Sequence, residues 1–184
     1  MYLEMKKIAV VETNVGDFIC GLENERPYDI HLSACHKTKE EIAELFAEKF
    51  GVRENLSPSQ LVKCSRRLLD DDMLNAKAVV TGANFLLSDT GSIVLTENEG
   101  NILKSLSCTP IHIVIAGIDK VLSSIEDLSV MLPLSSIYNA GNNIASSYTL
   151  VSGPSEIDGK FQDVYVILLN NGRTDIMAKE RQRS

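Results

Sequence analysis

Residues 111–120 read Ile-His-Ile-Val-Ile-Ala-Gly-Ile-Asp-Lys and decide the class of the fold. The apolar run Ile111 to Ala116 is typical of a strand that is buried on both faces of a parallel sheet. Glycine and polar residues follow it at once, at what would be the carboxyl end of the strand. Open α/β sheets bind their ligands at such ends, so the run predicts an α/β domain with candidate contacts at Asp119-Lys120.

Helix signals alternate with further strand signals along the chain. Thr38 and Glu41 form a capping box and Gly51 suits a left-handed C-cap, which together predict a helix over residues 38–50. Ser57-Pro58 predicts a second long helix to about Leu74. A shorter helix is expected at 16–22, and another after Ser123 or Ser124 that ends at Pro133. Strands are expected at 7–12, 29–32, 78–81, 93–96, 146–152 and 163–169.

Residues 81–101 contain more polar turn residues than a buried core requires. Asp89-Thr90-Gly91 predicts a tight hairpin turn in which glycine takes positive φ. The whole segment is predicted to border a recess for a hydroxylated or carboxylated small molecule, although Asx turns and glycine hinges are the alternative explanation. The candidate ligand contacts are Gly82, Asn84, Asp89, Thr90, Gly91, Asn98, Gly100 and Asn101.

Glu97 and Glu99 are the candidate catalytic residues. In an extended segment this spacing places both carboxylates on one face, where repulsion raises one pKa toward the range of a general acid. Solvated loop carboxylates are the alternative explanation.

Further candidates lie on or after the predicted strands. His112 is either a base or a hydrogen-bonded residue of the core. Asp119, Asn171 and Arg173 follow strand ends. The guanidinium of Arg173 suits a carboxylate or phosphate, or pairs with Asp175 or with a carboxylate of residues 97–99. No metal ligands are predicted.

Composition narrows the class of protein. At 184 residues with 44% hydrophobic content, the chain is expected to form a single domain over residues 1–184. A net charge of -7 argues against nucleic acid as a partner, and no apolar run is long enough for a membrane span. The four cysteines lack the spacing of a metal or cluster motif. A cytoplasmic location is expected.

The chain resembles the LUD domain shared by bacterial lactate-utilisation proteins. The residues that carry the resemblance cover nearly the whole chain: 10–19 (Val-Val-Glu-Thr-Asn-Val-Gly-Asp-Phe-Ile), 36–46 (His-Lys-Thr-Lys-Glu-Glu-Ile-Ala-Glu-Leu-Phe), 81–101, 111–120, 122–128, and 170–173 (Asn-Asn-Gly-Arg). Asp89 departs from the glutamate that is usual in the family. The resemblance implies a Rossmann-like α/β fold, a mostly parallel sheet with helices on both faces and an inserted β-hairpin, similar to the NagB/RpiA/CoA transferase-like superfamily.

The resemblance also implies a function. The chain would be the LUD portion of a longer iron–sulfur protein that takes part in oxidation of L-lactate to pyruvate together with other lactate-utilisation subunits. Iron–sulfur clusters bound outside this chain would transfer the electrons, and no cofactor is expected within it. The alternatives are a stand-alone enzyme or binder of small carboxylates or phosphorylated molecules that uses Glu97 or Glu99 with Arg173, and a purely structural interaction module.

Overall fold

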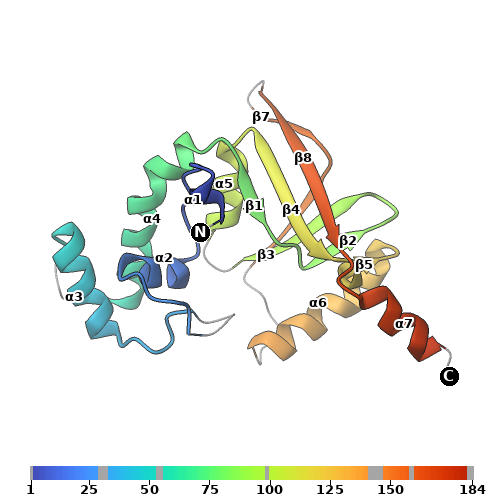
Figure 1. Ribbon diagram of the computed structural model, residues 1–184, viewed down its shortest axis with the longest axis horizontal. Coiled ribbons are helices and arrows are strands. Elements are labelled where there is room, and N and C mark those ends of the chain that lie inside the picture. The colour runs from blue at the N-terminus through green and yellow to red at the C-terminus, as the bar shows by residue number, and fades with distance from the viewer. Residues whose placement is uncertain are drawn as a thin grey trace. The chain divides into compact units, whose positions relative to one another are not determined.

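A computed structural model describes residues 2–28, 33–52, 56–97, 100–140, 147–157 and 160–181 (Figure 1). The chain divides into two compact units, Met1–Leu74 and Asn75–Ser184. The single domain expected from the length stays a prediction.

The first unit is helical. Its helices are α1 (Tyr2–Met5), α2 (Val15–Leu22), α3 (Lys39–Phe50) and α4 (Pro58–Asn75), the last of which ends at the unit boundary. The Asn14 side chain caps α2, with its Oδ1 2.9 Å from the Gly16 nitrogen. Both halves of the predicted capping box at Thr38 and Glu41 are present, and Gly51 has φ 65°. These local signals therefore confirm the predicted starts and ends.

A core of apolar side chains joins α2, α3 and α4. Its buried members are Ile19, Ala43, Leu45, Phe46 and Leu61. Phe46 is completely buried, and its ring meets Phe18 and Phe50 edge to face. Lys37 binds the carboxylates of Glu23 and Glu25, so an ion-pair cluster fastens the segment after α2 to the segment before α3.

The two strands predicted in this unit are not seen among the described residues. The strand predicted at residues 7–12 is wrong, because residues 8–13 have no regular structure. Ile8, Val10 and Val11 are exposed, and the sheets in the described residues give this segment no partner. β-branched residues favour extended backbone, but a strand needs a neighbour to pair with. The strand predicted at 29–32 lies outside the described residues.

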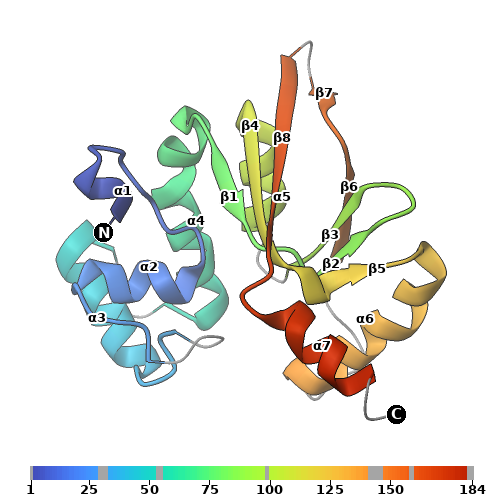
Figure 2. The ribbon, with the colours of Figure 1, turned by 45° about the vertical axis from the view of Figure 1, so that its right-hand side comes forward.

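The second unit contains two four-stranded sheets. Sheet A has the order β1 (Val79–Thr81), β4 (Ile111–Gly117), β8 (Lys160–Leu169), β7 (Ser155–Ile157), and sheet B has the order β5 (Val121–Leu122), β2 (Phe85–Leu87), β3 (Ser92–Glu97), β6 (Ser147–Ser152). β1, β4 and β8 run parallel, and so do β2 and β5. The segment from β6 into β7 passes from sheet B to sheet A (Figure 2).

The predicted mostly parallel sheet and the inserted hairpin are both confirmed. β2 and β3 pair antiparallel, and the turn between them contains Gly91 with φ 66°. The remaining elements are the helices α5 (Asn101–Cys108), α6 (Ile125–Ala140) and α7 (Arg173–Arg181) and the short 3₁₀ helix η1 (Ile118–Lys120). Helices and a mostly parallel sheet make this a mixed α/β fold.

The hairpin separates two apolar cores. Leu86, Ile93 and Leu95 pack with Leu106 of α5 and with Val114 of β4. The alternate positions Phe85, Leu87 and Val94 pack with Leu128 of α6. Successive side chains of a strand point to opposite faces, so one hairpin supplies both cores and lies between a helix on each side.

Two predicted details of this unit are wrong. β4 alternates instead of being buried on both faces: His112, Val114 and Ala116 are buried, whereas Ile115 is 40% exposed. At β4, one face of sheet A is therefore covered and the other is more exposed. The helix predicted to end at Pro133 continues to Ala140, since α6 contains this proline in its interior. Proline removes one backbone hydrogen bond, and here the helix continues past it. Helices α5 and α7 and strand β7 were not predicted.

Candidate functional site

Apart from His112, the predicted site residues that the structure describes lie in three places within the second unit. Asp89, Thr90 and Gly91 form the turn at the start of β3, whereas Asn84 and Glu97 lie near its other end. A six-residue strand is about 20 Å long, so the two sets are not brought together. Asp119, Asn171 and Arg173 lie at the carboxyl ends of β4 and β8. Asn98 and Glu99 lie outside the described residues.

Asn84 fixes the connection between β1 and the hairpin. Its backbone nitrogen donates to the carbonyl of Val94 at 2.9 Å, and its Oδ1 accepts from the nitrogen of Thr96 at 2.9 Å. Gly82 lies two residues before it, with its nearest neighbour, the carbonyl of Ile115, 3.9 Å from where a Cβ would stand. Asn84 is thus bound to the hairpin through both its backbone and its side chain, while Gly82 is exposed and has room for a Cβ.

Glu97 holds the beginning of α5. Its buried carboxylate accepts from the nitrogen of Ile102 at 2.9 Å and from that of Leu103 at 3.2 Å. Gly100, the N-cap, has φ 71°, and Asn101 is buried beside it. A carboxylate suits the positive end of a helix, so these contacts give Glu97 a structural role in joining β3 to α5.

A chain of hydroxyls runs from the hairpin turn into sheet B. Thr90 donates to the Oγ of Ser92 at 2.8 Å, and Ser92 shares a 2.8 Å hydrogen bond with Ser152 of β6. Asp89 makes no such contact with the described residues and is exposed. The turn is therefore stabilised through Thr90, whereas the side chain of Asp89 is accessible to solvent.

His112 is completely buried in β4. Its Nε2 lies 2.8 Å from Oγ1 of Thr81, and its Nδ1 has no hydrogen-bond partner in the described residues. Burial lowers the pKa of the imidazole. A neutral ring inside the core is suited to packing and hydrogen bonding.

The carboxyl ends of β4 and β8 carry an ion pair. Nε of Arg173 lies 2.5 Å from Oδ1 of Asp119. Asn171 and Gly172, with φ 43° and 78°, turn the chain from β8 into α7. Oδ1 of Asn170 accepts from the nitrogen and the hydroxyl of Thr174, both at 3.0 Å, and so caps α7. A guanidinium next to a helix N-terminus is suited to binding an anion.

Gln162 has a structural role that the sequence did not indicate. Its buried Nε2 donates to the carbonyls of Leu106 at 2.7 Å and Thr109 at 2.8 Å, and thereby satisfies the end of α5. A lone glutamine within a strand carries no motif, so no sequence signal points to this contact.

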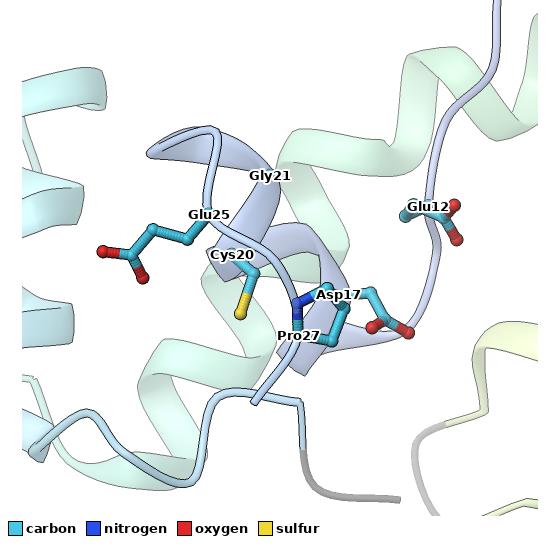
Figure 3. Close-up of a pocket in the computed structure, with 6 residues that line it drawn as sticks. All are labelled: Glu12, Asp17, Cys20, Gly21, Glu25 and Pro27. Atoms are coloured by element: carbon cyan, nitrogen blue, oxygen red, sulfur yellow. The ribbon is translucent and has the colours of Figure 1, made fainter. Parts of the chain in front are cut away.

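The first unit contains a hollow of about 290 Å³ that was also not predicted (Figure 3). Its lining consists of Glu12, Asp17, Cys20, Gly21, Glu25 and Pro27. Asp17 accepts from the hydroxyl of Ser33 at 2.5 Å, and the thiol of Cys20 donates to the carbonyl of the same residue at 3.4 Å. Burial raises the pKa of the Cys20 thiol, which keeps it protonated. Three carboxylates around the hollow disfavour an anionic ligand.

The cysteines and the other potential metal ligands lie apart in the described part of the chain. All four cysteines are free, and no three His, Cys, Asp or Glu side chains of the described residues gather as ligands. Among the described helices, none has both the length and the apolar composition to cross a membrane.

Curated relatives match nearly the whole chain. Lactate utilization protein B of Oceanobacillus iheyensis is 33% identical over 183 residues, which cover 98% of this chain and 38% of the relative. The protein of the same name from Bacillus licheniformis is 32% identical, again over 98% of this chain and 38% of the relative. That of Bacillus cytotoxicus is 32% identical over 93% of this chain and 36% of the relative. The chain thus spans little more than a third of the length of these relatives.

A solved structure and a family profile complete the comparison. A DUF162 family protein from Deinococcus radiodurans is 20% identical, with a TM-score of 0.38 over 53% of this chain and 56% of that one. The profile of the LUD domain matches residues 3–169 and so extends over both units. The chain belongs to the LUD domain family.

Proposed function

We propose that this chain is the LUD portion of a protein that takes part in the oxidation of L-lactate to pyruvate. The supporting observation is the match of residues 3–169 to the LUD domain, together with identity of about 30% over nearly the whole chain to proteins named lactate utilization protein B. Since those relatives are much longer, the activity belongs to the whole protein and its partner subunits. This chain contributes binding of a ligand or partner.

The electrons leave through iron–sulfur clusters that are held outside this chain. Its own cysteines are unsuited to holding one, because they are far apart in sequence and no ligand set forms among the described residues. The raised pKa of the Cys20 thiol also opposes the thiolate form that a cluster requires. We therefore expect the isolated chain to be redox-silent.

Growth and iron content test this proposal. Deletion of the gene in its host is expected to abolish growth on L-lactate but not on glucose, and the intact reading frame is expected to restore it. The protein encoded by that whole reading frame is expected to contain iron and to show the visible absorption of iron–sulfur clusters, whereas residues 1–184 alone are colourless. Undiminished growth of the deletion strain on L-lactate contradicts the proposal.

A second candidate function is binding of a small carboxylate or phosphorylated molecule by this chain itself, with Arg173 as the anion contact and Glu97 or Glu99 as the base. The ion pair of Arg173 with Asp119 supports the role of Arg173 as the anion contact, because it orients the guanidinium at a strand end. Calorimetry with L-lactate, coenzyme A and a sugar phosphate separates this function from a purely structural module, for which none of the three binds.

A further inference from the structure

The orientation of Arg173 leaves part of its guanidinium available. Its contact with Asp119 is made through Nε, so the two terminal nitrogens are not used in this ion pair. Arginine has five N–H donors in a planar fork, and the pair of terminal nitrogens matches the two oxygens of a carboxylate. Asp119 thus fixes the fork while the side chain remains 39% exposed.

Gly117 makes this orientation possible. A Cβ at Gly117 would lie 2.2 Å from Oδ1 of Asp119 and 3.2 Å from Nε of Arg173. Its φ of -67° is available to any residue, so the requirement for glycine comes from space and not from backbone conformation. The ion pair therefore lies directly against the bare main chain where β4 ends.

The pair also has a favourable place in the fold. Gly117 is paired with Leu169 at the carboxyl ends of the parallel strands β4 and β8. Arg173 begins α7, which leaves the end of β8 (Figure 2). The N-terminal end of a helix carries partial positive charge, and open α/β sheets bind ligands beyond the carboxyl ends of their strands.

We propose that Arg173 and Asp119 together bind a small 2-hydroxy carboxylate at the carboxyl ends of β4 and β8. The terminal nitrogens of Arg173 bind the carboxylate of the ligand. Asp119 positions the guanidinium through one oxygen, and its other oxygen accepts the hydroxyl of the ligand. The choice of a hydroxy acid among carboxylates rests on the proposed function in lactate oxidation.

Both charges of the pair are partly exposed, with 44% of the Asp119 side chain accessible, so a small ligand reaches them without rearrangement of the core. The carboxylate of Asp119 also offsets part of the charge of Arg173. We therefore expect weak binding, in the range of about 1 mM, which suits a metabolite at high concentration.

The test is titration of L-lactate, propionate and inorganic phosphate into the purified chain, followed by calorimetry and by the NMR signal of the arginine Nε–H groups. L-lactate is expected to bind better than propionate, which lacks the hydroxyl, and better than phosphate. Arg173→Gln is expected to weaken lactate binding about tenfold or more, the effect of losing a charged bidentate contact. Lys179→Gln removes one positive charge from the exposed surface of the same helix and is the matched control, with unchanged binding expected.

Asp119→Asn separates positioning from mere structural support. Asparagine keeps an oxygen that accepts from Nε, so α7 remains folded, but it removes the negative charge and the acceptor for the hydroxyl of the ligand. Propionate is expected to bind at least as well as to the wild type, and the preference for lactate over propionate is expected to fall. A residue that only held α7 in place would leave that preference unchanged. Circular dichroism confirms that each variant is folded.

Three results overturn the inference: no lactate binding to the wild type, equal binding to Arg173→Gln, or stronger binding of phosphate than of lactate. These results do not affect the growth experiment, because a role in lactate oxidation does not require that lactate binds at this surface. The converse outcome is a deletion strain that grows normally on L-lactate while the purified chain still binds lactate through Arg173. That combination would contradict the proposed role in lactate oxidation and support the binding site.

Discussion

His112 shares a hydrogen bond of 2.8 Å with Thr81, which lies on the neighbouring strand β1. The imidazole is completely buried, and its Nδ1 has no partner in the described residues. A protonated ring would need a second acceptor for the added proton, and the described residues provide none at Nδ1. The folded protein therefore holds His112 in its neutral form.

Stability is expected to fall on mild acidification because of this histidine. Burial lowers the pKa of His112 in the folded state below its ordinary value of about 6.5. Below that value the unfolded chain binds a proton that the folded chain does not, so the free energy of unfolding decreases as the pH falls from about 6.5 toward the lowered pKa. The slope is at most about 1.4 kcal/mol per pH unit. Urea unfolding between pH 7 and pH 5 measures it.

His112→Gln is the control for this effect. The amide can still bond to Thr81 but has no proton to gain, so the decrease between pH 7 and pH 5 is expected to shrink. The lowered pKa values of Glu25 and Glu41 act in a separate window, since their contributions are lost only below about pH 4.5. An identical pH profile for the variant and the wild type would show that His112 is not the source.

Glu97→Gln is expected to reduce the free energy of unfolding by about 1 kcal/mol. The amide oxygen can still accept from Ile102 or Leu103, but the charge that faces the N-terminus of α5 is lost. Glu97→Ala leaves both nitrogens without their acceptor and is expected to cost about 2 kcal/mol more. Chemical unfolding of the two variants provides the measurement. In any assay of activity, a fully active Glu97→Gln variant would remove Glu97 from the candidate catalytic residues.

Gln162→Leu is expected to destabilise the second unit by about 1–3 kcal/mol, because the carbonyls of Leu106 and Thr109 lose a buried donor. The neighbouring Phe161 is 72% exposed, so Phe161→Leu is the matched control, with a change of less than about 0.5 kcal/mol. Thermal unfolding distinguishes the two variants, and similar melting temperatures for both would show that the Gln162 contacts contribute little.

The sequence predicted those parts of the fold that depend on local interactions. The capping box at Thr38 and Glu41, the C-cap at Gly51 and the hairpin turn at Gly91 each involve residues within a few positions of one another. Such signals depend little on tertiary contacts, so the sequence alone predicts these caps and this turn. The parallel strand β4 was also evident, because its apolar run is long and closed by glycine.

The remainder depends on contacts between distant residues. The strand predicted at 7–12 failed because it has no partner in the described sheets, and α5 was missed because its N-terminus is stabilised by Glu97 of the preceding strand. The candidate site shows the same division. Strand ends indicated Asp119 and Arg173 as separate candidate contacts, but nothing in the sequence showed that they pair or that Gly117 makes room for them.

Phe46→Ala tests whether the two units unfold together. Removal of this completely buried ring is expected to cost about 3–5 kcal/mol, because it leaves a cavity among Ile19, Leu45 and Leu61. All members of that core belong to the first unit. We therefore expect faster amide hydrogen exchange in α2 and α3, with β4 and β8 unchanged, when exchange is followed by mass spectrometry.

The reciprocal variant is Val94→Ala, which removes apolar volume from a completely buried position of the second unit. Here exchange is expected to rise in β3 and α6 and to stay constant in α2 and α3. If either variant instead accelerates exchange throughout both units by the same factor, the chain unfolds as one cooperative body, and the single domain expected from its length is established.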